Sequence, residues 1–487
     1  MGVIKRQGIK NTIATYIGFV IGFVNLIVIQ PHLLTKEELG LTRILYSFSL
    51  LIAMFVPLGI GNATTRFFPM FKDHEKKHHG YFGFMLIFPL VGYVLAASII
   101  WLTKDLIIAQ YVKESKLFTE FFNYIFPMTF FVSFISILNI YCFSHFKSTI
   151  PTYINDILVR IITIGVVSMY YLHWLTLDQF IMAFTGIYAL QLAGLFFYIF
   201  IFDRPTFKID WVFFREKNFL QLIKFGLLLW FASVASIGLK YFDSIMIGKF
   251  MPLSFVAVYT VAAFIPTIIE APINAFEKIA SSKIAFAYAE NNMEEINDIY
   301  HKSSLYMFLI GGFIFLNVNI NIIDLLSFLP SGYQEGAIVV TILSVAALFN
   351  MATGLNAPIL FNSDKYRYGA FFLISLAVVV LALQIILIPL MGMKGAATAT
   401  CIASLFYNSL LFGFVWYHFK LQPFGNKNLQ VLAIIILLYA IGMFLPDMHN
   451  RYINIIWRSG IISLLFGVLV YMLKIVPDFF DKKNFKL

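Results

Sequence analysis

Residues 226–249 read GLLLWFASVASIGLKYFDSIMIGK, a stretch that is apolar and long enough to cross a lipid bilayer. A hydrocarbon core about 30 Å thick needs roughly 20 helical residues. Two charged residues, Lys240 and Asp243, nevertheless lie inside this stretch. Together with Ser233 and Ser236 they follow steps of three, four and three, so the four side chains share one face of a helix. The pattern predicts a membrane-spanning helix with one polar face.

The first apolar segment of the chain carries the same polar pattern. Thr15, Gly18, Gly22 and Asn25 lie 218 positions before the four residues just named, in the same order and without a gap. The same offset keeps the first six apolar segments in phase with the next six. Because six is an even number, two such copies have the same orientation and are related by an axis along the membrane normal. The sequence therefore predicts an internal repeat of six helices.

The composition defines the class of protein. The chain has 487 residues, of which 60% are hydrophobic and 12% are charged, and its mean hydropathy is +0.84. These values indicate a polytopic helical membrane protein rather than a soluble domain with one anchor. The apolar segments are long and continuous, unlike the short alternating strands of a membrane barrel. The net charge of +10 is scattered through short loops, so no nucleic-acid partner is predicted.

The predicted fold is an all-α membrane protein with about fourteen transmembrane helices. Two six-helix lobes, residues 1–210 and 211–420, are followed by a further helix pair and tail at 421–487. The predicted spans are 8–31, 40–65, 81–103, 119–144, 152–173, 177–202, 219–249, 254–280, 303–328, 336–361, 368–390, 394–419, 428–446 and 454–476.

The distribution of basic residues predicts the orientation in the membrane. With both termini placed in the cytoplasm, the inner loops and span ends hold 25 of the 35 Lys and Arg residues. Basic residues accumulate on the cytoplasmic side of membrane proteins. Both termini are therefore expected in the cytoplasm. An aromatic and basic segment around Trp211 and Arg215 looks like an amphipathic helix at the inner membrane surface.

One short motif suggests a metal site. HEKKH at residues 74–78 matches H-E-x-x-H, in which two histidines one helical turn apart bind zinc and the glutamate acts as a base. The motif lies in a short charged loop and continues into His79, with no apolar helix around it. The favoured interpretation is a solvated, positively charged loop, without a metal. Replacing His74 and His78 with Ala is then expected to leave function intact.

Catalytic signatures are missing from the sequence. It contains no G-x-x-x-x-G-K-[ST] phosphate-binding loop and no G-x-S-x-G turn. Neither ATP-driven transport by this chain nor hydrolysis is therefore predicted.

Charges inside the apolar segments are the most informative signal for function. A charge at the bilayer centre costs about 2.5–3.5 kcal/mol on insertion scales, so it usually faces a partner or a water-filled cavity. Lys240 and Asp243 could also neutralise each other as a local ion pair. Glu270 lies between Pro266 and Pro272, which break the helix locally and could expose its backbone to a cavity.

For three arginines the sequence allows either an interior position or a position at the membrane surface. Arg160 lies in the fifth predicted span and either faces the protein interior or extends toward the membrane surface. Arg43 and Arg66 lie near the outer and inner ends of the second predicted span, where an interfacial position is favoured.

Three stretches of sequence carry a family resemblance. They are PHLLTKEELGLTRIL (31–45), YFDSIMIGKFMPLSFVAVYT (241–260) and LIPLMGMKGAATAT (387–400). With fourteen spans in two six-span lobes, they resemble the polysaccharide-biosynthesis branch of the multidrug/oligosaccharidyl-lipid/polysaccharide (MOP) exporter superfamily, and within it the Wzx-type flippases. The resemblance covers essentially the whole chain and identifies the branch rather than the substrate.

The resemblance implies a transporter of the bacterial inner membrane rather than an enzyme. Its substrate would be an undecaprenyl-pyrophosphate-linked oligosaccharide, such as an O-antigen-type repeat unit of a lipopolysaccharide or another surface polysaccharide. Alternating access between two lobes would move this lipid from the cytoplasmic to the periplasmic leaflet. Membrane lipids, a polysaccharide polymerase and its chain-length machinery are the implied partners. No cofactor is implied, although H⁺ or Na⁺ could be coupled to export.

A pyrophosphate crossing a membrane needs cationic partners. Unpaired polar groups in hydrocarbon cost several kcal/mol each. Lys240 is the predicted pyrophosphate contact, assisted by Arg160 if that side chain faces inward. Arg43 and Arg66 are further candidates for the same substrate.

The remaining candidates are polar side chains on the repeated face and two carboxylates. Hydrogen bonds to sugar hydroxyls are predicted for Asn11, Thr15, Asn25, Ser233 and Ser236. Asp243 and Glu270 are the candidates for ion coupling, because desolvation can raise the pKa of a carboxylate toward neutrality.

Two other functions remain open. A small-molecule exporter of the multidrug type would share the fold but would need an acidic, aromatic pocket, whereas the central cation favours an anionic lipid. An integral polysaccharide polymerase or ligase is a weaker alternative, because such enzymes typically carry a large periplasmic loop and the outer loops of this chain are short.

Overall fold

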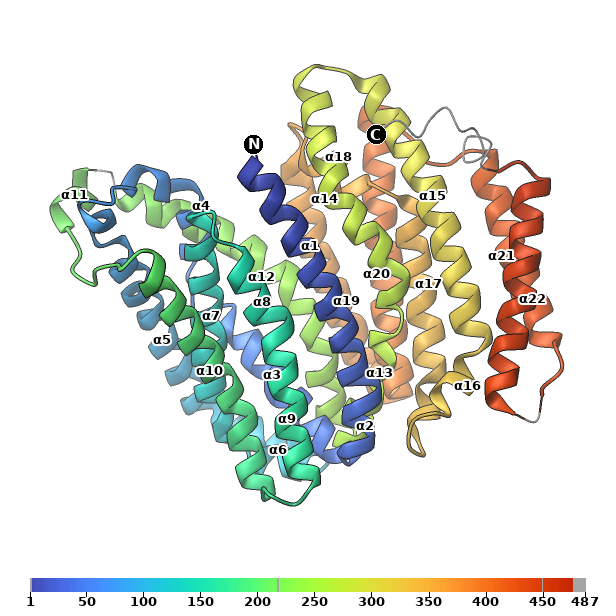
Figure 1. Ribbon diagram of the computed structural model, residues 1–487, viewed down its shortest axis with the longest axis horizontal. Helices are drawn as coiled ribbons and strands as arrows, with labels where there is room; N and C mark the ends of the chain where they lie inside the picture. Colours follow the sequence, from blue (N-terminus) through green and yellow to red (C-terminus); the bar gives the residue numbers. More distant parts are fainter. Residues whose placement is uncertain (1, 217–218, 449, 476–487) are drawn as a thin grey trace. The chain divides into compact units, whose positions relative to one another are not determined.

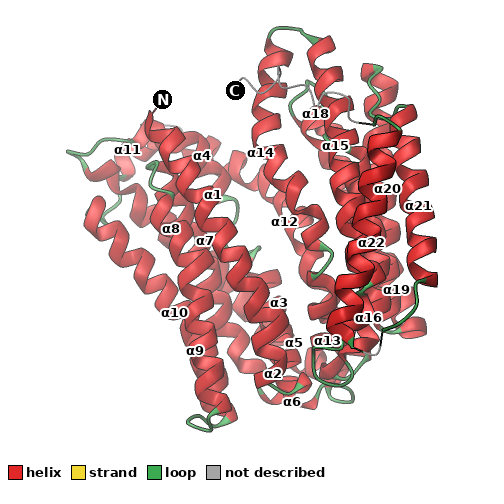
Figure 2. Cartoon of the chain, turned by 45° about the vertical axis from the view of Figure 1, so that its right-hand side comes forward, coloured by secondary structure: helices red, strands yellow, loops and turns green. Residues whose placement is uncertain are grey.

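The computed structural model describes residues 2–216, 219–448 and 450–475. Within these ranges the side chains of residues 2–9, 12, 216, 219, 228–229, 231–240 and 278 are outside the description. Every regular element in the described part of the chain is a helix (Figure 2). The predicted all-helical fold is therefore confirmed.

The chain forms two compact units, Met1–Ala257 (unit 1) and Val258–Leu487 (unit 2). The helices that begin in unit 1 are α1 (Gly2–Phe23), η1 (Val24–Ile29), α2 (Gln30–Leu33), α3 (Lys36–Ala53), α4 (Ile60–Phe71), η2 (Lys77–Gly80), α5 (Tyr81–Tyr111), α6 (Lys116–Glu120), η3 (Phe122–Tyr124), α7 (Ile125–Ser144), α8 (Thr149–Tyr153), η4 (Ile154–Leu158), α9 (Val159–Tyr171), α10 (Leu177–Phe202), α11 (Trp211–Glu216), α12 (Phe219–Phe250) and α13 (Leu253–Phe264). Those of unit 2 are α14 (Thr267–Ala289), α15 (Met293–Ile320), α16 (Ile322–Leu326), η5 (Tyr333–Gly336), α17 (Ala337–Thr353), α18 (Asn356–Phe361), α19 (Tyr366–Met391), α20 (Met393–Phe419), α21 (Asn426–Phe444) and α22 (Arg451–Met472). Figure 1 shows them in chain order.

The unit boundaries differ from those of the predicted lobes. Helix α12 packs against α3 and α4 and so belongs to unit 1, although the sequence analysis placed it in the second lobe. Helices α21 and α22, predicted as a separate pair, pack against α15 within unit 2. The division into six-helix repeats stays a prediction. The helix bounds support it, since residues 149–171 shifted by 218 positions become 367–389 and α19 is Tyr366–Met391.

Eleven described helical segments are long and apolar enough to cross a membrane, and the bent pair α13–α14 would make twelve. The predicted number of about fourteen is not confirmed. The two predicted spans outside this set, 40–65 and 219–249, coincide with α3–α4 and with α12. The predicted span 40–65 is interrupted at residues 54–59, between α3 and α4. Gly59 in this break has a φ of +80°, a conformation that costs energy for any residue with a side chain. The chain is thus a multi-pass membrane protein.

Aromatic side chains form the packed core of unit 1. Phe68 of α4, Tyr81 of α5, Tyr141 of α7 and Phe214 of α11 are almost fully buried and belong to one cluster. The Tyr81 hydroxyl donates to Thr64 Oγ1 at 3.1 Å, which satisfies the polar group of a buried ring. This core fixes the ends of α4, α5 and α7, where the loops of unit 1 meet.

Candidate functional site

The polar face of α1 packs against the helix formed by α8, η4 and α9. Asn11 Nδ2 donates to Ser148 Oγ at 2.7 Å, and Thr15 Oγ1 donates to Asp156 Oδ2 at 3.1 Å. Figure 1 shows α1, α8 and α9 side by side. The polar face that the sequence predicts on the first helix therefore meets polar side chains of unit 1.

Arg160 points toward α1. Its Nη1 donates a hydrogen bond to the carbonyl oxygen of Gly18. A Cβ at Gly22 would overlap the Arg160 guanidinium, and a Cβ at Gly18 would lie 2.7 Å from the Cβ of Asp156. The glycines of the polar face thus leave the space that Arg160 and Asp156 fill.

Arg43 is held by two buried amide side chains. Its Nη2 donates to Gln30 Oε1, and Gln30 Nε2 donates to Asn25 Oδ1 at 3.1 Å. Asn25 and Gln30 are each at most 5% exposed. Asn25 lies in η1, a π-helical turn of a kind that occurs frequently at functional sites. Asn25 orients Gln30, and Gln30 orients the Arg43 guanidinium.

Tyrosine rings lie beside both arginines. Tyr46 of α3 stacks on Tyr188 of α10 with ring centroids 5.3 Å apart, and it meets Tyr241 of α12 edge-on at 6.4 Å. The Tyr46 hydroxyl shares a hydrogen bond with Tyr188 and lies within electrostatic range of Arg43 and Arg160. We call Asn25, Gln30, Arg43, Tyr46, Asp156 and Arg160 the arginine cluster.

The arginine cluster carries two guanidinium groups and one carboxylate, an excess of one positive charge. Guanidinium groups bind phosphate oxygens through pairs of parallel N–H···O bonds. Neutral amides and tyrosine hydroxyls offer further hydrogen bonds without adding charge. The cluster can therefore attract an anion with several oxygen acceptors.

Arg66 lies on α4, beyond the break that ends α3. Its guanidinium carbon is 4.4 Å from the centroid of the Phe225 ring and 5.5 Å from that of Phe67. This cation–π stacking joins α4 to α12 and is worth about 0.5–1 kcal/mol at an exposed site. Arg66 is exposed, and its interfacial position stays a prediction.

Three predicted residues of α12 lie outside the described side chains: Ser233, Ser236 and Lys240. Their backbone is helical, and their proposed contacts stay predictions. Asp243, one turn further, is half-buried.

The segment after Asp243 has a structural role. Tyr111 Oη donates to the Ile245 carbonyl at 3.0 Å, and Ser115 Oγ donates to the Gly248 carbonyl at 2.6 Å. The end of α5 thereby binds the backbone of α12.

Glu270 lies in the first turn of α14. Pro266 precedes this helix and separates it from α13, whereas Pro272 lies inside α14 without ending it. Asn350 Nδ2 of α17 donates to Glu270 Oε1 at 3.1 Å. Glu277, two turns further along α14, lies within electrostatic range of Glu270. The sequence analysis missed Glu277, which its spacing of seven residues from Glu270 could have indicated.

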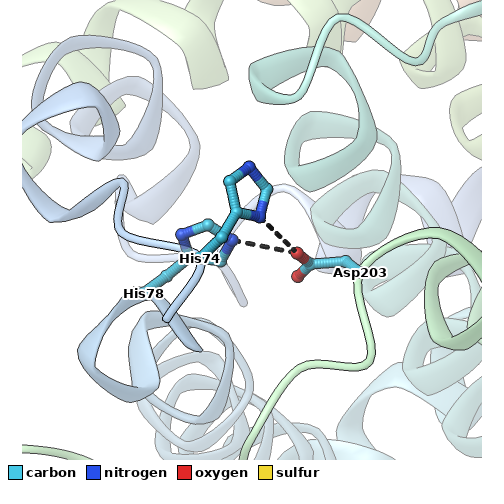
Figure 3. A group of neighbouring side chains, drawn as sticks. All are labelled: His74, His78 and Asp203. Atoms are coloured by element: carbon cyan, nitrogen blue, oxygen red, sulfur yellow. Dashed lines mark hydrogen bonds and ion pairs between the residues drawn. The ribbon is translucent and has the colours of Figure 1, made fainter. Parts of the chain in front are cut away.

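The prediction of a solvated loop at residues 72–80 is wrong for two of its histidines. His78 and His79 are 1% and 7% exposed, because Asp203 and Asp210 from the chain after α10 bind them. His74 stays exposed, and its Nδ1 lies 3.9 Å from Asp203 Oδ1. Figure 3 shows the rings of His74 and His78 directed at the Asp203 carboxylate. A regular helix, which H-E-x-x-H zinc sites require, does not form over residues 74–78.

The donor atoms of His74, His78 and Asp203 lie within 4.8 Å of one another, close enough to share a metal ion. The hydrogen bonds of His78 oppose that use. The backbone N–H of Asp73 donates to His78 Nδ1 at 3.0 Å, so this nitrogen carries no proton. In the neutral ring the proton is then on Nε2, which donates to Asp203 Oδ1 at 2.9 Å. A protonated nitrogen cannot bind a metal.

Unit 1 also contains an apolar cavity of about 410 Å³. Its walls come from the end of α3, the start of α4, α7 and Trp230 of α12. Trp230 Nε1 donates to the carbonyl of Met54 at 2.9 Å. Asn62, Thr65 and Ser136 are polar groups in an otherwise apolar lining.

Sequence reasoning missed several residues that complete the arginine cluster. Gln30 and Asp156 are polar residues within apolar segments, and Asp156 precedes Arg160 by one helical turn. That spacing places both on one face of a helix and could have indicated them. Tyr46 and Tyr188 gave no signal among 25 tyrosines.

Several solved structures share the fold of this chain. The structure titled lipid II flippase MurJ, inward closed conformation, superposes with a TM-score of 0.71 at 15% identity, covering 96% of this chain and 100% of that one. An inward-facing multidrug resistance MATE transporter of the MOP superfamily gives 0.64 at 15% identity, covering 83% and 94%. A MOP superfamily transporter from Pyrococcus furiosus gives 0.55 at 17%, covering 86% and 95%. At these identities the likeness shows the fold alone, which this chain shares with those three proteins.

The chain belongs to the polysaccharide biosynthesis protein family. The model of that family matches residues 4–281, more than half of the chain. No curated protein matches the sequence.

Proposed function

We propose that this protein is a flippase for an undecaprenyl-pyrophosphate-linked oligosaccharide, the lipid-linked repeat unit of an O-antigen or another surface polysaccharide. It works in the bacterial inner membrane with both termini in the cytoplasm and moves its substrate by alternating access. A polysaccharide polymerase and its chain-length machinery then take up the product. The family and the MurJ-like fold support this class, and the arginine cluster supports the anionic substrate.

The position of the two arginines carries the proposal. A cation inside a membrane protein costs several kcal/mol unless it is paired or faces water. Here the chain gives Arg43 a neutral amide and Arg160 a backbone carbonyl as hydrogen-bond partners. Asp156 is the one carboxylate of the arginine cluster, and a pyrophosphate that approaches both guanidinium groups gains Coulomb energy from each of them.

The other candidate residues take supporting roles in this proposal. Lys240 contacts the pyrophosphate, and Arg66 attracts the head group near the membrane surface. Asp243 and Glu270 are the groups through which H⁺ or Na⁺ would drive export. Sugar hydroxyls bind to the polar residues of the repeated face: Asn11, Thr15, Asn25, Ser233 and Ser236.

Binding of the lipid head group tests the proposal directly. The purified protein in nanodiscs is titrated with undecaprenyl pyrophosphate. Arg43→Gln and Arg160→Gln should each weaken binding roughly 10- to 100-fold, because a hydrogen bond to a charged group contributes about 1.5–3 kcal/mol. Arg367→Gln removes an exposed charge outside the cluster and should leave the affinity unchanged. Equal affinity for all four proteins would contradict the proposed site.

Export of small molecules is the second candidate, and the apolar cavity of unit 1 favours it. A volume of about 410 Å³ lies in the range typical of drug-sized ligands. Trp230→Ala would enlarge this cavity and remove its hydrogen bond to Met54. If drug export is the function, this change should alter drug resistance and leave surface glycan unaffected.

A further inference from the structure

The loop between α4 and α5 contains an unusual run of left-handed backbone. Lys77, His78 and His79 have φ values of +47°, +54° and +52°, and Gly80 follows at +73°. Each residue with a side chain pays about 1–2 kcal/mol for this conformation. Such backbone persists only where surrounding contacts hold it, and it is common in switch regions.

Two histidine–aspartate pairs hold this run in place. His78 binds Asp203 through Nε2, and His79 Nδ1 lies 3.1 Å from Asp210 Oδ2. The Asp210 backbone N–H also donates to the His79 carbonyl at 3.1 Å. The His79 ring lies flat on Phe213 with centroids 3.5 Å apart. The strained turn is therefore fastened to the segment after α10.

A third histidine lies against the same carboxylate. His145, at the end of α7, donates from Nδ1 to the Tyr141 carbonyl at 3.0 Å. In the neutral ring its Nε2 then carries a lone pair, which lies 3.7 Å from Asp203 Oδ1 and 3.4 Å from His78 Nε2. The Tyr141 hydroxyl donates to the other Asp203 oxygen. Asp203 is thus surrounded by His78, His145 and Tyr141, and its side chain is 2% exposed.

A further proton on His145 would disturb this arrangement. On His145 Nε2 it would create a second N–H facing the His78 N–H across 3.4 Å. Lys72 also lies within electrostatic range of His145, and its positive charge disfavours protonation of that ring. The exposed His74 lies near the same carboxylate, with Nδ1 3.9 Å from Asp203 Oδ1.

We propose that His78, His145 and Asp203 form a proton-sensitive latch, which fastens the strained turn 77–80 to the segment after α10 when His145 is neutral and releases it on acidification. The ligand of this site is a proton, and its binding changes which segments of unit 1 are held together. The latch ties the chain before α5 to the ends of α7 and α10, so its release frees one end of three helices within unit 1.

The charge balance of the folded cluster supports this direction. Burial lowers the pKa of His145, and this outweighs the opposite effects of the Tyr141 carbonyl and the Asp203 carboxylate. Burial alone would raise the pKa of Asp203, but hydrogen bonds from His78 and Tyr141 hold it below its usual value. In both cases the unfolded segment binds protons more readily than the folded one. The latch therefore loses stability as pH falls below the ordinary His pKa of about 6.5.

Hydrogen–deuterium exchange of the full-length protein in nanodiscs tests the latch. After correction for the intrinsic pH dependence of exchange, protection of residues 72–80 and 203–213 should fall between pH 7.5 and 5.5, because acidification favours the protonated state that the folded cluster disfavours. His145→Asn keeps a donor for the Tyr141 carbonyl but cannot titrate, and it should reduce this pH dependence. His32→Asn is the matched control, because exposed His32 Nδ1 lies 2.7 Å from the carbonyl four residues earlier.

Two results would overturn the inference. Protection of both segments that is equal at the two pH values in the unsubstituted protein would show that no proton controls the turn. Stoichiometric zinc binding at pH 7.5 that His145→Asn abolishes would show that the cluster holds a metal instead. The unsubstituted protein alone decides the first point, so the result does not depend on how well the variants fold.

Discussion

Gly22 has no side chain, and the Arg160 guanidinium lies in the space that a side chain there would fill. The position of this charge therefore depends on Gly22 as well as on Arg160. With a methyl group at Gly22, Arg160 would have to move away from α1. Arg160 would then lose its hydrogen bond to the Gly18 carbonyl. The direction of this charge, inward or toward the membrane surface, is set by the residue opposite it.

Gly22→Ala should therefore reduce glycan export. The overlap should also lower the free energy of unfolding by about 1–3 kcal/mol, the usual cost of overpacking. Gly165→Ala is the matched control on α9, because a Cβ there would meet no atom within 4 Å among the described residues. Export and thermal unfolding are measured at equal membrane abundance. Equal export by the two variants would contradict the position of Arg160.

The Lys240–Asp243 pair is tested by comparing single and double substitutions. The two residues lie one turn apart, about 4.5 Å along the helix axis. If they only neutralise each other, the double Ala variant should function, because a single removal alone leaves an unpaired charge. If Lys240 binds the pyrophosphate, Lys240→Ala and the double variant should both lose export while inserting normally. Restored export in the double variant would show a structural pair.

Single candidate residues were predictable from sequence where a charged side chain lies in an apolar segment, because such a charge is costly in a membrane. Arg43, Arg160 and Glu270 are charges in apolar segments, and each has a polar partner in the structure. The burial of His78 was not predictable, because its partner Asp203 lies 125 residues further along the chain. A loop histidine carries no local signal for such a contact.

At the level of helices, the segment DSIMIG of α12 contributes two backbone carbonyl groups to its contact with the chain around the end of α5. Tyr111 and Ser115, at the end of α5, bind the carbonyls of Ile245 and Gly248. A third hydrogen bond runs the other way, because Trp230 of α12 donates to the backbone carbonyl of Met54. All three bonds attach α12 to other segments of unit 1. These contacts fix the helix that carries Asp243 and Lys240.

Ser115→Ala should lower the melting temperature of the purified protein. It removes a buried donor and leaves the Gly248 carbonyl without that bond, which costs about 1–3 kcal/mol. Thr119→Ala is the control, because the Thr119 hydroxyl bonds only within its own turn, to the Lys116 carbonyl. Scanning fluorimetry compares the two. A larger shift for Thr119→Ala would refute the role of Ser115.

Hydropathy and spacing predicted where helices lie better than where they break. Each predicted span overlaps a helix of the structure, since apolar length is a property of the local sequence. The interruption at residues 54–59 and the π-helical turns η1 and η4 were not predicted. They depend on backbone hydrogen bonds and on packing against neighbouring helices, which hydropathy does not report.

For the whole molecule, the fold follows from composition and the substrate does not. A chain that is 60% hydrophobic and built of long apolar segments must form a helical membrane protein. Flippases and multidrug exporters share this fold, so the fold does not identify the substrate. In the proposed function a few polar residues select it. Orientation in the membrane is a separate property, set by the basic residues of the loops.

Reporter fusions at Lys77 and Lys116 test this orientation. Lys77 precedes α5 and Lys116 follows it, so the two positions should lie in opposite compartments, with Lys77 in the cytoplasm. A cytoplasmic and a periplasmic reporter are compared at each position. The same compartment for both would show that α5 does not span the membrane.

The central claim is that this protein moves a lipid-linked oligosaccharide, and the measurement that tests it most directly is the fate of that lipid in a strain lacking the gene. The deletion should remove one surface polysaccharide and leave its undecaprenyl-pyrophosphate-linked precursor on the cytoplasmic leaflet. The unsubstituted gene should restore export, and Arg160→Gln at equal abundance should not. Normal surface glycan together with new drug sensitivity would contradict the claim and identify a small-molecule exporter.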